Sequence, residues 1–288
     1  MVKITIISPE GKSCSVWNLK NEIEKLGYKA EIFLLSHPEA LMSYDFKLDC
    51  DLIHSRCGIG CYFDRLTLYS WQFINALEVE GYKFVNSLKT IYLTSDKFKS
   101  IKLLAKHKIP TPKTALIRDY EDAVRFIKKY NLSFPVVIKD SFSKCGLRVF
   151  IARNFDELKN LTKNAIWEGK LIQEFINFKE GDLYKDMRIL VVDGEVVGGY
   201  RRVSRDFRTN IYLGNYVEEL KIDEDLEELA LKCADLSEAV ILGVDILPTK
   251  EDYYVIELNS APGTKGFKYL RINADKKIAE ALVRYAKQ

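Results

Sequence analysis

Three oxygen-bearing side chains near the end of the chain could bind a divalent cation. Glu257 and Asn259 stand two positions apart in an apolar run, so in a strand they share one face while Ile256 and Leu258 point inward. Asp245 can reach the same face from a neighbouring strand. Carboxylate and amide oxygens suit Mg²⁺, whose shell is completed by water and phosphate oxygens. We expect a magnesium site here; the alternative is a strand that ends in polar turn residues.

A β-hairpin is predicted ahead of this site. An Asp-Gly turn at 193–194 joins two apolar runs and is a strong signal for a two-residue hairpin loop. The loop sets the register, which places Asp186 opposite Arg201 and Arg188 opposite Gly199. Cross-strand partners share a face, so we expect Asp186, Arg188 and Arg201 to point together, with the glycine leaving room above them.

A strip of arginines continues beyond the hairpin and ends in Arg208-Thr209-Asn210. Such a strip could be a solvated face or an RNA-binding stripe, but neither explains its place beside the predicted metal carboxylates. Arginine offers planar, paired donors to phosphate and carboxylate groups. A metal ion and fixed cations together can neutralise a transferring phosphoryl group. The strip therefore favours recognition of these anions.

Two lysines stand where a phosphate chain could bind. Lys139 ends the apolar run at 136–138 before a polar loop, and Lys97 lies on the turn of a predicted helix that carries Ile101 and Leu104. Lys139 alone would suit a surface position, but the pair favours phosphate binding. The sequence has no Walker A motif, no GxGxxG after the first strand and no kinase motif set, so the common nucleotide-binding folds are not supported.

The composition is that of a globular protein. The chain has 288 residues, 47% of them hydrophobic and 30% charged, enough for two or three subdomains. No apolar run reaches the length of a membrane span and the opening residues read as a strand, so we expect no membrane partner and a cytoplasmic location. The net charge of +3 arises from 44 basic and 41 acidic residues, which does not indicate a nucleic-acid partner.

Apolar periodicity predicts the elements that position these residues, beginning with a small α/β unit that has a parallel sheet and ends near residue 95. Another helix is capped by Thr94 or Ser95 and stopped by Pro110. The other predicted helices cover 15–26, 156–167 and 223–239, with one starting at 272, and the predicted strands cover 4–8, 28–34, 51–60, 134–139, 147–152, 187–192 and 195–203.

A cluster of thiols and one histidine admits two interpretations. Cys50, His54, Cys57 and Cys61 could form a metal site, but no CxxC pair occurs and the spacing matches no common zinc motif. Cysteine is also a small core residue. We expect reduced structural thiols here.

In chain order, a longer series of motifs connects the groups described above. The motifs are Ser95-Asp96-Lys97, Pro135-Val136-Val137-Ile138-Lys139, Gln173-Glu174-Phe175-Ile176, Asp186-Met187-Arg188, Arg201-Arg202, Asp206-Phe207-Arg208-Thr209-Asn210, Gly243-Val244-Asp245 and Glu257-Leu258-Asn259-Ser260-Ala261-Pro262-Gly263. The series resembles the ATP-grasp ligases of the RimK type, which include the ribosomal-protein glutamate ligase RimK and archaeal ligases that add glutamate to coenzymes. The resemblance covers almost the whole chain and is highly specific for the fold and for ATP use.

The resemblance implies an α/β (α+β) ATP-grasp fold, in which two lobes clasp ATP behind a small α/β pre-ATP-grasp domain. The predicted limits are 1–95 for the N-terminal domain, 96–172 for the central lobe and 173–288 for the C-terminal lobe. The implied ligands of ATP are Lys97 and Lys139 for its phosphates, the backbone at Gln173, Glu174, Phe175 and Ile176 for its adenine, and Asp186, Arg208, Thr209 and Asn210. Asp245, Glu257 and Asn259 would bind two Mg²⁺ or Mn²⁺.

The resemblance also implies a reaction. A carboxylate attacks the γ-phosphate of ATP to give an acyl phosphate and ADP, and an amine then displaces phosphate to form an amide. Arg188, Arg201 and Arg208 would hold the transferring groups, and alignment of the reactants would supply much of the rate enhancement. The amine would be L-glutamate or another amino acid, and the acceptor the carboxyl end of a coenzyme or of a protein.

Other interpretations stay open. The chain could be a non-catalytic ATP sensor, and Arg56 could contact the acceptor or merely cap its turn. Two positions depart from the family: the loop 140–146 has a single glycine, and Gly214-Asn215 stands where relatives tend to have two glycines. We also expect a homo-oligomer.

Overall fold

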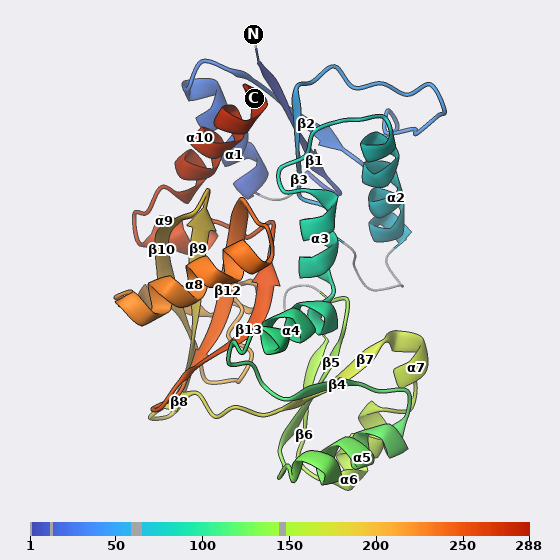
Figure 1. The fold of residues 1–288 in the computed structure, drawn as a ribbon, viewed down its shortest axis with the longest axis vertical. Coiled ribbons are helices and arrows are strands. Elements are labelled where there is room, and N and C mark those ends of the chain that lie inside the picture. The colour runs from blue at the N-terminus through green and yellow to red at the C-terminus, as the bar shows by residue number, and fades with distance from the viewer. Residues whose placement is uncertain (1, 12–13, 59–64, 144–147) are drawn as a thin grey trace.

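The computed structural model describes residues 2–11, 14–58, 65–143 and 148–288. Three parts follow one another along the longest axis, and both termini lie at the same end (Figure 1). The N-terminal part occupies that end, a large sheet lies in the middle and a smaller lobe lies opposite. Two short helices, α3 (Leu88–Ser95) and α4 (Lys97–Lys106), lead from the N-terminal part toward the smaller lobe and pack against the large sheet.

The N-terminal part contains a parallel sheet in the order β2-β1-β3. Its apolar strands are buried, as is usual for parallel sheets. The strands are β1 (Lys3–Ser8), β2 (Lys29–Leu34) and β3 (Leu52–Ser55), and the helices are α1 (Cys14–Lys25) and α2 (Arg65–Val79). The predicted parallel α/β unit is confirmed, whereas α2 was not predicted.

The large sheet is antiparallel and carries the predicted metal ligands. Its order is β11-β10-β9-β12-β13, with β8 paired to β9. The strands are β8 (Lys179–Glu180), β9 (Leu183–Val192), β10 (Glu195–Ser204), β11 (Tyr216–Glu219), β12 (Ile241–Pro248) and β13 (Tyr253–Asn259), and the accompanying helices are α8 (Glu224–Leu236), α9 (Lys265–Tyr269) and α10 (Ala274–Ala286). The helices predicted at 223–239 and from 272 are α8 and α10, each slightly shorter than expected.

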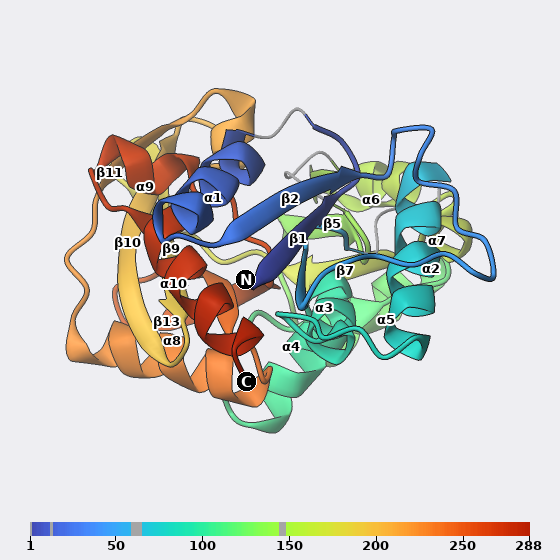
Figure 2. The same cartoon turned by 90° about the horizontal axis from the view of Figure 1, so that it is seen from above.

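Two apolar cores lie against opposite faces of this sheet. Met187, Ile189 and Val244 pack with α8 on one face. Alternate residues such as Leu190 and Ile241 face the other side, where α9, α10 and α1 cover them. Helices α1 and α10 lie side by side over this second face (Figure 2). The charged residues of the predicted site lie on this same face, farther along the strands than the part that the helices cover.

The hairpin of β9 and β10 starts in the predicted register. Val192 pairs with Glu195, and Asp193 and Gly194 both have positive φ, as a type I′ turn requires. The register then shifts by one residue at a bulge that follows Val196.

The prediction for the rest of the hairpin is therefore wrong. Arg188 lies opposite Tyr200 and not Gly199, and Asp186 lies opposite Arg202 and not Arg201. A bulge puts an extra residue into one strand, and a slip of one position moves every later side chain of that strand to the other face. Arg202 consequently joins Asp186 and Arg188, and Arg201 turns away from them.

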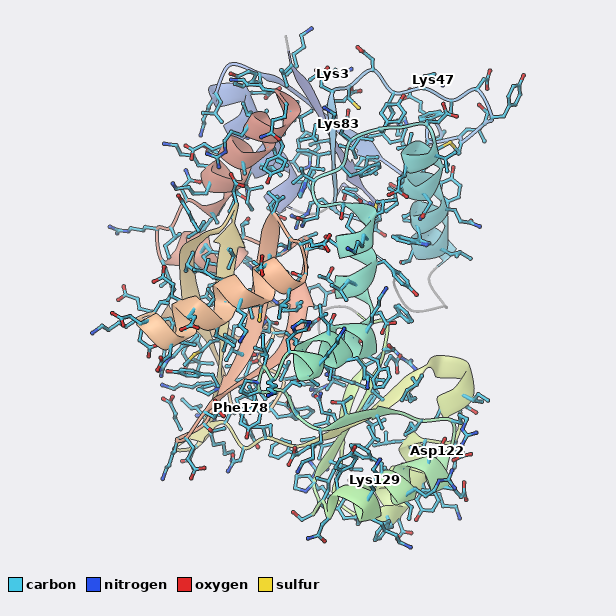
Figure 3. All side chains as sticks on the ribbon, in the orientation of Figure 1. Lys3, Lys47, Lys83, Asp122, Lys129 and Phe178 are labelled. Atoms are coloured by element: carbon cyan, nitrogen blue, oxygen red, sulfur yellow. The ribbon has the colours of Figure 1, made fainter. Side chains whose placement is uncertain are left out.

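The smaller lobe is a four-stranded antiparallel sheet in the order β4-β7-β5-β6. Its strands are β4 (Thr114–Leu116), β5 (Val136–Asp140), β6 (Val149–Ala152) and β7 (Lys170–Glu174), and its helices are α5 (Tyr120–Tyr130), α6 (Phe155–Leu161) and α7 (Ala165–Glu168). Asp122 and Lys129 mark α5 at the far end of the molecule, whereas Phe178 lies between this lobe and the large sheet (Figure 3).

Two predicted helices have different boundaries. The helix expected from a Thr94 or Ser95 cap begins at Lys97, because the Asp96 side chain accepts hydrogen bonds from the amides of Phe98 and Lys99. The helix expected at 156–167 is divided into α6 and α7 by a turn at 162–164. No helix in the described ranges combines the length and apolar character needed to cross a bilayer.

Candidate active site

The three predicted metal ligands share one face of the large sheet. Asp245 on β12 pairs directly with Glu257 on β13, and Gly243 pairs with Asn259. Cross-strand partners point to the same side, so the two carboxylates and the amide are neighbours. Gly243 has no side chain, and a Cβ there would lie 2.9 Å from Pro262, so only glycine lets the segment after β13 pack so closely.

Asp245 is buried and its charge is balanced by two arginines. Arg188 donates to its two carboxylate oxygens at 2.6 and 2.7 Å, and an Nη2 of Arg202 lies 3.0 Å away. Burial alone would raise the pKa of Asp245, but the two guanidinium groups outweigh burial and lower it. Burial likewise opposes the charge of Arg188, yet Asp245 raises the pKa of this arginine. Both groups are therefore charged.

Arg202 connects this pair to Asp186, and sequence reasoning did not select it. It is 3% exposed, and it donates through Nε and Nη2 to both carboxylate oxygens of Asp186, with Nε at 2.7 Å from Oδ1. The bulge that brings it onto this face leaves no clear trace in the sequence. The only available signal was the Arg201-Arg202 pair itself, since one of two adjacent arginines in a strand must face inward.

Arg201 lies on the opposite face from this network. Its Nη1 donates to Glu180 Oε1 at 2.9 Å, and both side chains are partly exposed. The structure thus brings Arg188 but not Arg201 beside Asp245.

Two lysines lie near this face: Lys97 on α4, and Lys139 on β5 of the smaller lobe. Lys97, the first residue of α4, is 7% exposed; its Nζ donates to the Ser143 carbonyl and lies 3.5 Å from Glu257 Oε1. Lys139, at 6% exposed, donates from β5 to Gln173 Oε1 at 3.0 Å. Burial, and next the charge of Lys97, lower the pKa of Lys139 to about 8. Two crowded cations of this kind favour an anionic ligand.

The predicted adenine segment continues from a strand into an extended connection. Gln173 and Glu174 end β7, and the Glu174 amide already donates to the Lys113 carbonyl at 2.8 Å. Phe175 and Ile176 follow the strand, and within the described ranges their backbone amides make no hydrogen bond. These two positions are therefore the ones that can offer backbone donors and acceptors to a base.

The segment Arg208-Thr209-Asn210 is held by Asn215, one of the two departures from the family pattern. The Asn215 side chain donates to the carbonyls of Arg208 and Asn210 at 2.8 and 3.2 Å. Thr209 is buried, and although burial raises the pKa of Asp186, the side chain of Thr209 is among the neighbouring groups that oppose this rise. Arg208 remains partly exposed and pairs with Asp206 at 2.9 Å. Only the middle residue of the segment thus reaches the arginine network.

Arg56 lies between the N-terminal part and the segment after β13. Its Nη2 donates to the Pro262 carbonyl at 3.1 Å and approaches Ser15 Oγ at 3.4 Å. Burial lowers its pKa. In the described ranges no carboxylate lies within ion-pair distance of it, so it has donors left for a ligand.

Other predicted features lie partly outside the described residues. These include Cys61 of the thiol cluster and Lys144 and Gly146 of the loop at 140–146. Cys50 is a free thiol, the Sγ of the buried Cys57 lies 4.0 Å from the Ile7 carbonyl, and the buried His54 bonds through Nδ1 to the Val85 carbonyl at 2.8 Å. Burial, and next the charge of Arg56, lower the pKa of His54 to about 4, so it is neutral.

The chemistry of the donor set fits a hard divalent cation. Asp245 and Glu257 supply carboxylate oxygens and Asn259 supplies an amide oxygen, which are ligands for Mg²⁺ or Mn²⁺. Asn259 Oδ1 accepts one hydrogen bond from the Ala261 amide at 3.0 Å, which leaves it a second lone pair. Asp245 Oδ1 also keeps a lone pair beside its bond to Arg188, whereas Oδ2 accepts from Arg188 and is approached by Arg202 as well. Among the described residues no group of three or more His, Cys, Asp and Glu is placed to hold a metal. Two carboxylates and one amide leave positions in the shell of such a cation for water and phosphate oxygens.

Two buried lysines beside a set of oxygen-bearing side chains form the arrangement expected of a nucleotide-dependent enzyme of the ATP-grasp class. A model of the RimK-like ATP-grasp domain matches residues 94–282. The chain therefore belongs to the RimK-like ATP-grasp family, and it is a ligase. The predictions of family, fold class and enzyme class are confirmed.

Individual relatives agree with this assignment. The chain is 85% identical over 287 residues to a protein named coenzyme gamma-F420-2:alpha-L-glutamate ligase from Methanocaldococcus jannaschii, covering 100% of each. It is 57% identical over 284 residues to a protein of the same name from Methanococcus maripaludis, covering 99% of each. The solved ATP-grasp ligase PsnB, in complex with a precursor variant, Mg and ADP, has a TM-score of 0.71 at 15% identity over 100% of this chain and 99% of that one, which shows the fold alone.

Proposed function

We propose that this ligase joins L-glutamate to the carboxyl end of coenzyme γ-F420-2 through an acyl phosphate. The geometric observation that supports ligation is the 3.5 Å contact between Lys97 Nζ and Glu257 Oε1. Lys97 begins α4, which packs against β13, and its Nζ also donates to the Ser143 carbonyl of the smaller lobe, so a nucleotide bound by the two lysines would lie beside the proposed metal-binding face. The choice of glutamate and of the coenzyme rests on the names of the two relatives that match over the full chain.

Each residue has a proposed task in ATP binding. Lys97 and Lys139 bind the phosphates, and the backbone at Phe175 and Ile176 binds the adenine edge, next to Gln173 and Glu174. Arg208, Thr209 and Asn210, with Asp186 behind them, border the phosphates. Asp245, Glu257 and Asn259 would hold Mg²⁺ or Mn²⁺, which when bound neutralises phosphate charge and orients the γ-phosphoryl group.

The chain's own residues then direct two displacements. A carboxylate oxygen of the acceptor attacks the γ-phosphorus as the bond to ADP breaks, and the glutamate amine attacks the resulting acyl carbon as phosphate leaves. Arg188 is the proposed donor to the acyl phosphate, because its planar guanidinium already binds a carboxylate in paired geometry. Arg56 has free donors for a substrate carboxylate. Arg201, turned toward Glu180, is no longer proposed for this step.

The test is product formation with purified protein. Incubation with ATP, Mg²⁺, γ-F420-2 and L-glutamate should yield ADP, phosphate and a coenzyme heavier by one glutamyl residue, detected by mass spectrometry. D-glutamate and L-α-aminoadipate serve as matched amino-acid controls, and Mn²⁺ replaces Mg²⁺ in a parallel series. ATP binding without any amide product from any pair would instead support a sensor. The metal count, a homo-oligomeric assembly and a cytoplasmic location remain predictions.

A further inference from the structure

The residue after the metal ligand Asn259 is held from the N-terminal part of the chain. Asn86 lies just before α3 and is 1% exposed. Its side-chain amide donates to the Ser260 carbonyl at 2.8 Å and to the Ile241 carbonyl at 2.7 Å. Its side-chain oxygen accepts from the amides of Val240 and Ile241 at 2.8 and 3.0 Å. One buried side chain thus ties the start of β12 to the end of β13.

Thr94 holds the same residue through its side chain. It lies in the last turn of α3, and its Oγ1 is hydrogen-bonded to Ser260 Oγ at 2.8 Å. Thr94 is 6% exposed and Ser260 is 7% exposed, so little water competes for this bond. The backbone and the side chain of Ser260 are therefore each bound by a different residue of the N-terminal part.

The position of Ser260 determines where the Asn259 side chain can lie. Asn259 Oδ1 accepts from the amide of Ala261, so the side-chain amide of Asn259 is tied to the backbone that Ser260 begins. Arg56 holds the next part of this segment at the Pro262 carbonyl. The segment 260–262 is thus bound at successive points by residues far away in the sequence.

We infer that Asn86 and Thr94 are positioning residues for the metal site: by holding Ser260 they keep the Asn259 amide oxygen on the face shared by Glu257 and Asp245. This inference rests on the proposed metal-binding role of these three side chains. Groups that orient a metal ligand influence affinity even though they never touch the ion.

Thr90 provides a matched control on the same helix. It is one turn from Thr94, is fully buried, and its Oγ1 also bonds to the C-terminal lobe. Its partners are the carbonyls of Ser237 and Glu238, which lie in the turn before β12 and not beside a metal ligand. Valine replaces either threonine at nearly equal volume and removes only the hydroxyl.

The experiment measures Mn²⁺ affinity directly, by titration followed by electron paramagnetic resonance in the presence of ADP, beside thermal unfolding. We expect Thr94→Val to weaken Mn²⁺ binding about tenfold. Thr94→Ser, which keeps the hydroxyl, should restore the original affinity. Thr90→Val should lower the unfolding midpoint about as much as Thr94→Val without changing the Mn²⁺ affinity. Asn86→Asp keeps the accepting oxygen but loses the donors to the Ser260 and Ile241 carbonyls and places a carboxylate oxygen against them, so it should weaken Mn²⁺ binding at least as much as Thr94→Val and lower the unfolding midpoint further.

A Glu257→Ala variant distinguishes failure of the proposed metal site from failure of the proposed positioning role. If it binds Mn²⁺ as well as the unchanged protein, the proposed metal site is wrong. If it loses Mn²⁺ binding while Thr94→Val and Thr90→Val retain the same affinity, the metal site stands and the positioning role is overturned. Equal loss of affinity in both threonine variants would also overturn it, because the effect would then follow from general loosening of the helix.

Discussion

The two lobes that face each other at the site differ in how their charges are compensated. On the large sheet, Asp186, Arg188, Arg202 and Asp245 form a closed set in which every charge has an opposite partner within 3.0 Å. On the opposite side, Lys97 of α4 and Lys139 of the smaller lobe are both buried and repel each other, and among the described residues Glu257 is the carboxylate that pairs with Lys97 and acts on Lys139. The lysines are thus prepared for an anion before it arrives, whereas the arginine network must exchange partners when ligands bind.

The largest expected effect comes from removing the group that lies between the lobes. Glu257→Ala deletes a proposed metal ligand whose side chain is 30% exposed, so little core volume is lost. We expect turnover to fall by a factor on the order of 10² to 10³, since charge stabilisation in the transition state is lost. Unfolding in denaturant should be nearly unchanged. Full activity in a steady-state assay of ADP release would remove Glu257 from the mechanism.

Two adjacent arginines sharpen the comparison within the large sheet. Arg202→Met leaves the buried Asp186 carboxylate without its paired donors, and breaking such a buried pair costs about 3–5 kcal/mol. Arg201→Met removes a partly exposed pair with Glu180, worth about 0–1 kcal/mol. The free energy of unfolding in urea measures both variants. A larger loss in the Arg201 variant would contradict the observed register.

The same pair of arginines shows the limit of sequence reasoning. Alternation along β13 correctly grouped Glu257 with Asn259, and the Asp-Gly turn correctly set the first pair of the hairpin, because both follow from local backbone geometry. The bulge after Val196 is decided by tertiary packing, where Gly198 at φ 153° lies against Ile272, a residue far away in the sequence. The adjacent arginines and the glycines at 198 and 199 are compatible with a bulge, but they do not by themselves reveal that Arg202 faces the site.

The hydrogen bonds of Asn86 and Thr94 to Ser260 were not predicted from the sequence, for a similar reason. In the sequence Asn86 has the character of an ordinary turn residue. Its side chain makes four hydrogen bonds to three residues, each more than 150 positions away. Long-range polar contacts of this kind follow from the fold and not from periodicity. Lys97 and Lys139 were recognisable by contrast, because one stands just before the apolar stripe of a helix and the other ends an apolar strand.

The uncompensated lysines predict a pH dependence of intermediate size. Burial, and next the charge of Lys97, lower the pKa of Lys139 from its ordinary value of 10.5 to about 8, so the lysine is charged below pH 8 and loses its proton above it. The cost of burying the charged form is therefore present below pH 8 and is relieved as pH rises from 8 toward 10.5. Bound phosphates favour the charged form, so ATP binding above pH 8 must take up a proton.

Calorimetry in buffers of different ionisation enthalpy measures this proton uptake. ATP affinity should fall above pH 8 with a limiting slope of about tenfold per pH unit, because one proton is bound with the ligand. Lys139→Met should bind ATP more weakly at pH 7 and lose this slope. A slope that persists in the variant would assign the titration to another group.

The smallest expected effect concerns the segment that borders both regions. Asn215→Gly restores the two glycines that relatives tend to have and removes the donors to the Arg208 and Asn210 carbonyls. Each lost hydrogen bond of this partly exposed kind is worth about 0.5–1.5 kcal/mol, and water can replace part of it. We expect the KM for ATP to rise about threefold while kcat changes little, since the segment is proposed to border the phosphates and is not proposed to contact the acyl phosphate. Asn215→Ala provides the control, because it removes the same donors without adding a glycine. If the alanine variant kept the original KM while the glycine variant did not, backbone freedom and not the lost donors would explain the change, and the segment would owe its order to Thr209 alone.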